Sequence, residues 1–183
     1  MWGASLGKRG TEMGLVRRAG VWRPGVLVAV FAALGFVFAG SASAQRRPVI
    51  GSFKSTDTSV DPGVSAACGF TVTETDVSTG RFEVFFDSSG TPVRAQVEEH
   101  YTGFFSANGL MVDVAGAALS KFDFNGGETD AGINIRVYAP GGGILYIDRG
   151  RLVLDDSGNL VFEAGPHPSL HGDFGGLCAA STP

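Results

Sequence analysis

The chain has 183 residues, of which 14 are basic and 18 acidic, and its formal net charge is −4. Nucleic-acid binding depends on basic patches, and an anionic membrane surface attracts basic segments, so this balance argues against both partners. An excess of acidic residues also keeps an exported protein soluble.

The first 44 residues show the three-part pattern of a secretory signal peptide. Basic residues come first, a charge-free apolar run of 14 residues occupies Val26–Ala39, and small residues follow it. Ala42-Ser43-Ala44 fits an A-x-A cleavage site, so we expect the mature chain to begin at Gln45. The alternative is an uncleaved membrane anchor, but a bilayer needs about 20 apolar residues.

The sequence divides into three predicted segments, and a start of translation at Met13 instead of Met1 would only shorten the first of them. Cleavage after residues 1–44 leaves nine basic and 17 acidic residues, a net charge of −8, and no membrane anchor. Residues 45–66 are polar and rich in Ser, Thr, Pro and Gly, which predicts a flexible N-terminal arm. Residues 67–183 are long enough for a single β domain with its own core.

Both cysteines, Cys68 and Cys178, lie in the part that remains after cleavage. In an oxidising compartment two cysteines most simply pair, so we predict a Cys68–Cys178 disulfide. Two separate buried thiols are the alternative. A metal pair is disfavoured, because no His lies at ligand spacing from either Cys.

Short runs of β-branched and aromatic residues recur from Ala67 onward, separated by turn residues such as Asn108-Gly109. This is the pattern of an all-β fold, here an antiparallel meander with negligible helix. A closed barrel hides the edge strands of a meander, so we prefer a small barrel to a two-sheet sandwich. The predicted runs are 70–74, 81–86, 93–105, 110–114, 119–124, 133–138, 144–148, 152–154 and 160–162.

Four short motifs carry a resemblance to a known group of proteins. They are Ala67-Cys68-Gly69-Phe70, Tyr146-x-Asp148-x-Gly150-Arg151-Leu152-Val153, Gly165-Pro166-His167-Pro168 and Leu177-Cys178-Ala179-Ala180. Together they resemble an uncharacterised family of small secreted actinobacterial proteins that have an early C-G-F and a C-terminal C-A-A. The resemblance implies export and supports the paired cysteines, and it brings no activity.

Two places in the sequence group polar residues that could act chemically. Strand alternation sends Glu98 and His100 to one face and Glu99 and Tyr101 to the other. A Glu–His pair can perform acid–base chemistry, although a solvated strand face is the commoner role.

The second place is His167, four residues before His171 and flanked by Pro166 and Pro168. The prolines disfavour a helix that would present both imidazoles to one metal. The simpler role for His167 is a loop histidine that hydrogen-bonds a backbone carbonyl near the disulfide.

No nucleophile motif, metal-ligand set or cofactor fingerprint is present, so we predict no catalytic residue, no metal and no cofactor. The favoured hypothesis is a non-enzymatic binding or structural module, with a small apolar ligand among aromatic side chains. Its candidate ligand-binding residues are His100, Tyr101 and His167. The alternative is an extracellular barrel-type enzyme that uses His100 or His167 with a carboxylate.

Overall fold

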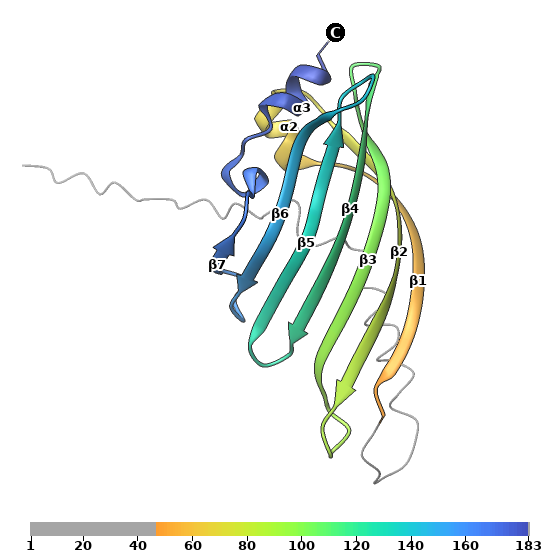
Figure 1. The fold of residues 1–183 in the computed structure, drawn as a ribbon, viewed down its shortest axis with the longest axis vertical. Coiled ribbons are helices and arrows are strands. Elements are labelled where there is room, and N and C mark those ends of the chain that lie inside the picture. Colours follow the sequence, from red (N-terminus) through yellow and green to blue (C-terminus); the bar gives the residue numbers. More distant parts are fainter. Residues whose placement is uncertain (1–46, 183) are drawn as a thin grey trace, which may run out of the picture.

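The structure is a computed structural model that describes residues 47–182, so the predicted signal segment lies outside the described residues. Seven antiparallel strands form one sheet, and they lie side by side in chain order (Figure 1). The strands are β1 (Val49–Val60), β2 (Thr73–Phe86), β3 (Pro92–Ala107), β4 (Leu110–Asp123), β5 (Gly127–Tyr138), β6 (Ile144–Leu154) and β7 (Leu160–Ala164). The prediction of an all-β antiparallel meander is therefore confirmed.

The sheet is open, so the preferred closed barrel is wrong, and the single sheet is not the two-sheet sandwich either. Within residues 47–182, β1 and β7 are the two edges and do not pair with each other. The physical reason lies in β7, which has five residues and pairs only four of them with β6. Gly165 and Pro166 then follow, so β7 is too short to close against the 12 residues of β1.

The predicted arm differs from the structure, because residues 49–60 form β1 and pair with β2 along their whole length. The side chains alternate between half-buried and exposed, with Val49 and Phe53 on the half-buried side. The apolar period is hard to see because Gly51, Ser55 and Asp57 occupy the same side. Strand pairing with β2 outweighs this weak local pattern.

Three short helical segments follow the first and last strands, where negligible helix was predicted. They are α2 (Pro62–Cys68), the 3₁₀ helix η2 (Pro168–His171) and α3 (Gly175–Ala180). Asp61 caps α2, since its Oδ1 accepts hydrogen bonds from the N–H groups of Gly63 at 2.8 Å and Val64 at 2.9 Å.

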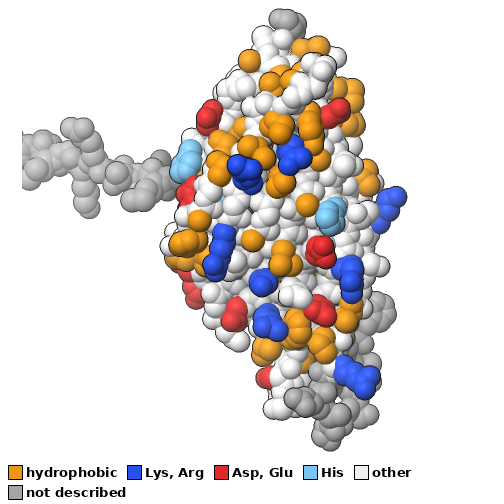
Figure 2. Space-filling model, viewed as in Figure 1, with side chains coloured by type: hydrophobic (Ala, Val, Ile, Leu, Met, Phe, Trp, Pro, Cys, Tyr) orange, Lys and Arg blue, Asp and Glu red, His pale blue; other side chains and the backbone are white. Residues whose placement is uncertain are grey.

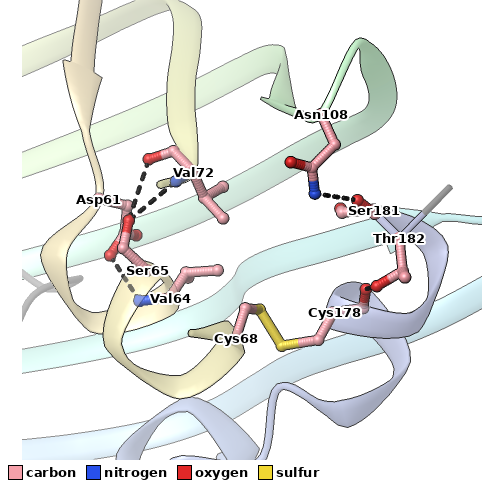
Figure 3. The surroundings of a disulfide bond; sticks show 9 residues. All are labelled: Asp61, Val64, Ser65, Cys68, Val72, Asn108, Cys178, Ser181 and Thr182. Atoms are coloured by element: carbon pink, nitrogen blue, oxygen red, sulfur yellow. Dashed lines mark hydrogen bonds between the residues drawn. A yellow bond between two sulfur atoms is a disulfide. The ribbon is translucent and has the colours of Figure 1, made fainter. Parts of the chain in front are cut away.

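A disulfide joins α2 to α3, as predicted, with 5.1 Å between the Cα atoms of Cys68 and Cys178 (Figure 3). Next to it, the Asn108 side-chain amide donates to the Ser181 carbonyl at 3.0 Å. Asn108 and Gly109 form the predicted two-residue hairpin turn, with φ values of 53° and 80°. This end of the sheet is therefore tied to both helices.

Most buried side chains lie on one face of the sheet, called the inner face below. Its helix-covered half holds ten buried residues, among them Val64 of α2 and Leu177 of α3. The other half, called the open half, has a second cluster of Val84, Ala95 and Val97, which contains no helix residue among the described ones. Four half-buried phenylalanines pack on that cluster: Phe53, Phe82, Phe86 and Phe122.

Glycines cross the inner face between these two halves and explain why the predicted runs merge into fewer strands. Gly132 of β5 pairs directly with Gly150 of β6, and Gly80 occupies the same level on β2. In β4, Gly116 continues the strand because the Tyr101 ring of β3 lies over it. An aromatic ring over a cross-strand glycine buries the bare backbone and maintains register.

Gly116→Ala is expected to destabilise the fold by about 1–3 kcal/mol, the usual cost of overpacking a filled site. An added Cβ would lie 2.6 Å from Cζ of Tyr101 and 2.7 Å from the Asn134 carbonyl oxygen. Urea unfolding measures the loss. Gly126→Ala is the control, since its Cβ would lie 3.4 Å from the nearest atom, in Asp123. Equal effects of both changes would contradict the role given to the Tyr101 ring.

Candidate functional site

Basic side chains of the described strands occur on one face of the sheet only, whereas carboxyl side chains occur on both; those on the outer face are Glu83, Glu98, Asp113 and Asp123. The strand register places every described strand Lys and Arg on the outer face: Lys54, Arg81, Arg94, Lys121, Arg136, Arg149 and Arg151. Basic side chains are spread across the face seen in Figure 2. The same register places eight carboxyl side chains on the inner face: Asp57, Glu74, Asp76, Glu99, Glu128, Asp130, Asp148 and Glu163.

Two of these carboxyls, Glu128 and Asp130, form a pair in the open half. They are two residues apart on β5 and therefore point to the same side. Glu128 lies between its cross-strand partners Phe122 and Leu154, and Asp130 is paired across the strands with Ser120 and Leu152. The surroundings are thus mostly apolar.

This carboxyl pair is buried with unsatisfied oxygen atoms. Glu128 is 7% exposed and Asp130 is 5% exposed. Oε2 of Glu128, both carboxyl oxygens of Asp130 and Oε1 of Glu99, at the next level of the face, have no partner at full hydrogen-bond geometry. A buried polar atom without a partner is destabilising, so each such group in a native fold needs an explanation.

Burial and the neighbouring Asp130 carboxyl raise the pKa of Glu128 to about 8. Burial also raises the pKa of Asp130, although the adjacent Ser120 hydroxyl and Glu128 oppose this shift. At neutral pH the pair therefore retains a proton that two free carboxyls would have lost. Paired groups with such raised pKa values are typical of functional sites.

Glu128→Gln is expected to reduce a pH dependence of stability. The folded-state pKa of Glu128 is about 8 against an ordinary value of 4.5, so the native protein binds the proton more tightly than the unfolded chain. The free energy of unfolding of the unmodified protein should therefore be highest below pH 4.5 and fall as the pH rises towards 8.

One pKa unit corresponds to about 1.4 kcal/mol, but the side chain keeps some solvent screening, so we expect the variant to be more stable at pH 8 by about 1–2 kcal/mol. Urea unfolding at pH 5, 6, 7 and 8 measures this difference. The control is Glu98→Gln, which removes an exposed carboxyl on the outer face. A difference that does not grow with pH would disprove the raised pKa.

A hollow of about 150 Å³ lies beside Glu128, next to the turn that joins β4 to β5. Phe122 and Leu154 line it from the inner face, and Lys121 and Arg94 line it from the outer side. Pockets for drug-sized ligands usually have about 300–1,000 Å³, so this hollow alone holds only a small group.

A second polar cluster is centred on Asp148 of β6, in the helix-covered half. Nδ1 of His167 lies 2.6 Å from one carboxylate oxygen of Asp148, and the Asn134 amide donates to the same oxygen at 3.3 Å. The Ser169 hydroxyl donates to the other oxygen. Nε2 of His167 lies 3.2 Å from the Ala164 carbonyl, which can only accept, so this nitrogen bears a proton.

These residue types match a Ser–His–Asp triad, but their order in space does not. In a catalytic triad the imidazole lies between the serine and the aspartate and takes the serine proton. Here the carboxylate of Asp148 lies between Ser169 and His167, and both ring nitrogens of His167 are occupied. The side chains of His167 and Asp148 are 0% and 2% exposed, so the network holds the segment after β7 against the sheet.

The three predicted ligand-binding residues lie in two places. His100 is on the outer face, exposed, with Nε2 3.5 Å from Glu98 Oε1. Tyr101 is buried on the inner face and donates its hydroxyl to the Asn134 carbonyl. Through Asn134 and Asp148, Tyr101 belongs to the same network as His167. The structure therefore brings Tyr101 and His167 together but not His100.

The carboxyl pair was not predicted from the sequence. Glu128 and Asp130 have the i, i+2 spacing that places two side chains on one face of a strand. The signal was missed because the predicted run began at Ile133, which left both residues in a turn.

Within residues 47–182, no group of three or more His, Cys, Asp or Glu side chains is placed to hold a metal ion. In the same range, none of the helices has the length and apolar character needed to cross a membrane. Comparisons with protein-family models, curated proteins and solved structures find no match.

Proposed function

We propose that the protein is a non-enzymatic binding module, exported from the cell, whose open half binds a small and mostly apolar molecule. The observation that carries this proposal is the buried carboxyl pair Glu128–Asp130, whose unsatisfied oxygens lie among phenylalanine and leucine side chains. Small-molecule sites combine a largely apolar lining with a few polar groups of this kind.

The arrangement of the aromatic side chains supports the same proposal. Phe53, Phe82, Phe86 and Phe122 are only half-buried although they pack on a fully buried cluster. Their remaining exposed surface lies on the same face as the two carboxyls, on the half that no described helix covers. A ligand there would bury aromatic area, which is the main source of affinity for small apolar molecules.

Export is part of the proposal and is supported by the Cys68–Cys178 disulfide, because such bonds persist in oxidising compartments. The signal segment 1–44 and the resemblance to small secreted actinobacterial proteins remain predictions from the sequence.

The test is titration of the purified protein with the neutral fluorophore N-phenyl-1-naphthylamine, whose emission rises in apolar surroundings. We expect saturable binding that Phe122→Ala weakens at least fivefold, because Phe122 lines the hollow beside Glu128. Phe104→Ala is the matched control, since Phe104 is also half-buried but lies on the outer face. No binding, or equal weakening by both changes, would overturn the proposal.

A further inference from the structure

We infer that the open half is selective for organic cations, and that the Glu128–Asp130 pair receives the ammonium group of an apolar amine. This inference rests on the proposed function and narrows it to one ligand class. The apolar part of such a molecule would lie on the phenylalanines, and its charged end would lie at the middle of β5.

The charge of the inner face is complementary to that of a cationic ligand. The inner face carries eight carboxyl side chains, whereas the described strand Lys and Arg side chains are all on the outer face. No basic side chain of a described strand is therefore available on this face to pair with Glu128 or Asp130. A cationic ligand would supply the missing charge, and an anionic ligand would be repelled.

Three carboxyl oxygens of the Glu128–Asp130 pair are buried and in need of a hydrogen-bond donor. Asp130 is only 5% exposed, and neither of its carboxyl oxygens has a partner at full hydrogen-bond geometry, although the Ser120 hydroxyl and Glu128 lie close enough to oppose the rise of its pKa. One oxygen of Glu128 is in the same state. A primary ammonium group has three N–H donors, so it can satisfy oxygens of both carboxyls at once.

A divalent metal ion is a poorer match to this site. Calcium requires six to eight oxygen ligands, and magnesium requires an octahedral set. The cross-strand neighbours Phe122, Leu152 and Leu154 offer none, and Ser120 offers one hydroxyl. The apolar neighbours instead suit the carbon chain of an amine.

The other groups that face the pair strengthen the preference for a cation. On β4 and β6 the adjacent inner-face side chains do not titrate. On β3 the nearest inner-face titratable group is Glu99. On β7 it is Glu163, which lies opposite Leu152 and has Oε1 3.1 Å from Nε2 of His171. Lys121 and Arg94 line the hollow beside Glu128, but from the outer face of the sheet.

Binding of an amine should release a proton. The ligand enters as an ammonium ion and keeps its own protons. Its positive charge favours the ionised form of Glu128, so the carboxyl O–H bond breaks and the proton passes to a buffer base. Up to about one proton per bound ligand should therefore appear in the buffer near pH 7.

The experiment is isothermal titration calorimetry of the purified protein at pH 7 with 4-phenylbutylamine and 4-phenylbutan-1-ol. The two probes differ only in the charged end. We expect the amine to bind at least tenfold more tightly. Its heat of binding should differ between phosphate and Tris buffers, because the two buffers take up the released proton with different enthalpies. The alcohol should show no such buffer dependence.

The variant that tests the assignment is the double change Glu128→Gln and Asp130→Asn, which keeps the shape of the uncharged side chains. It should bind amine and alcohol equally while retaining alcohol affinity and a native circular dichroism spectrum. Glu98→Gln, on the exposed outer face, should preserve the preference for the amine.

The outcomes separate this inference from the proposed function. Equal binding of both probes by the unmodified protein would overturn the amine assignment and leave the apolar site intact. Binding of neither probe would overturn both proposals. A double variant that still prefers the amine, or calcium chloride that displaces the amine at equal concentration, would also overturn the assignment.

Discussion

Replacing Asp148 by Ala is expected to destabilise the protein by about 3–5 kcal/mol, because the change removes one partner of a buried charged network. Asp148 accepts hydrogen bonds from Asn134 and Ser169 and is paired with His167. Without the carboxylate, the fully buried imidazole keeps the Ala164 carbonyl but loses its partner at Nδ1, and the half-buried Ser169 hydroxyl loses its acceptor.

Urea unfolding followed by circular dichroism measures this loss, and Glu98→Ala provides the control at an exposed position. We expect proteolysis of Asp148→Ala to begin in the segment after β7, since the network holds that segment to the sheet. Asp148→Asn retains an acceptor for Ser169 and should have a smaller effect. A loss below about 1 kcal/mol for Asp148→Ala would show that the network has little structural weight.

Removing the disulfide is the second change with a large expected effect. The bond closes a loop with a sequence separation of 110 residues. A loop of about 100 residues corresponds to about 4.7 kcal/mol in the chain-entropy model, and measured losses range over about 2–5 kcal/mol. The double variant Cys68→Ala and Cys178→Ala should therefore unfold at a markedly lower urea concentration.

The helices α2 and α3 pack onto the inner face through Val64 and Leu177, so they should loosen first. Dithiothreitol should lower the stability of the unmodified protein towards that of the double variant and leave the double variant unchanged. If reduction has no effect on the urea midpoint, the disulfide does not contribute to stability in the way the loop length predicts.

The strand content and the disulfide could be predicted from the sequence because their signals are local or few in number. Alternating apolar residues and the Asn108-Gly109 turn define the meander, and two cysteines have one possible intramolecular pairing. The continuity of β4 and β6 could not be predicted, because Gly116 and Gly150 are strand breakers until a cross-strand neighbour covers them or pairs with them.

Closure of the sheet into a barrel depended on the length of β7, and the sequence pattern does not show how many residues of an edge strand will pair.

The candidate site was not predicted because its environment forms only in the folded sheet. Glu128 and Asp130 are ordinary solvated carboxyls until β4 and β6 bring Phe122, Leu152 and Leu154 beside them. Asp148 and His167, 19 residues apart, become a pair only through the turn after β7.

Basic side chains of the described strands occur on the outer face only, so the inner face carries an excess of negative charge. The basic side chains of the outer face point away from the inner face, and where they reach solvent their field is screened over a Debye length of about 8 Å at physiological ionic strength. A negative potential on one side then persists although the described strands also carry seven basic side chains. The apolar side chains of the open half have a low dielectric constant and strengthen that potential. Small cations should therefore associate with the open half faster than neutral molecules of equal size. Added salt should remove this difference in association rate.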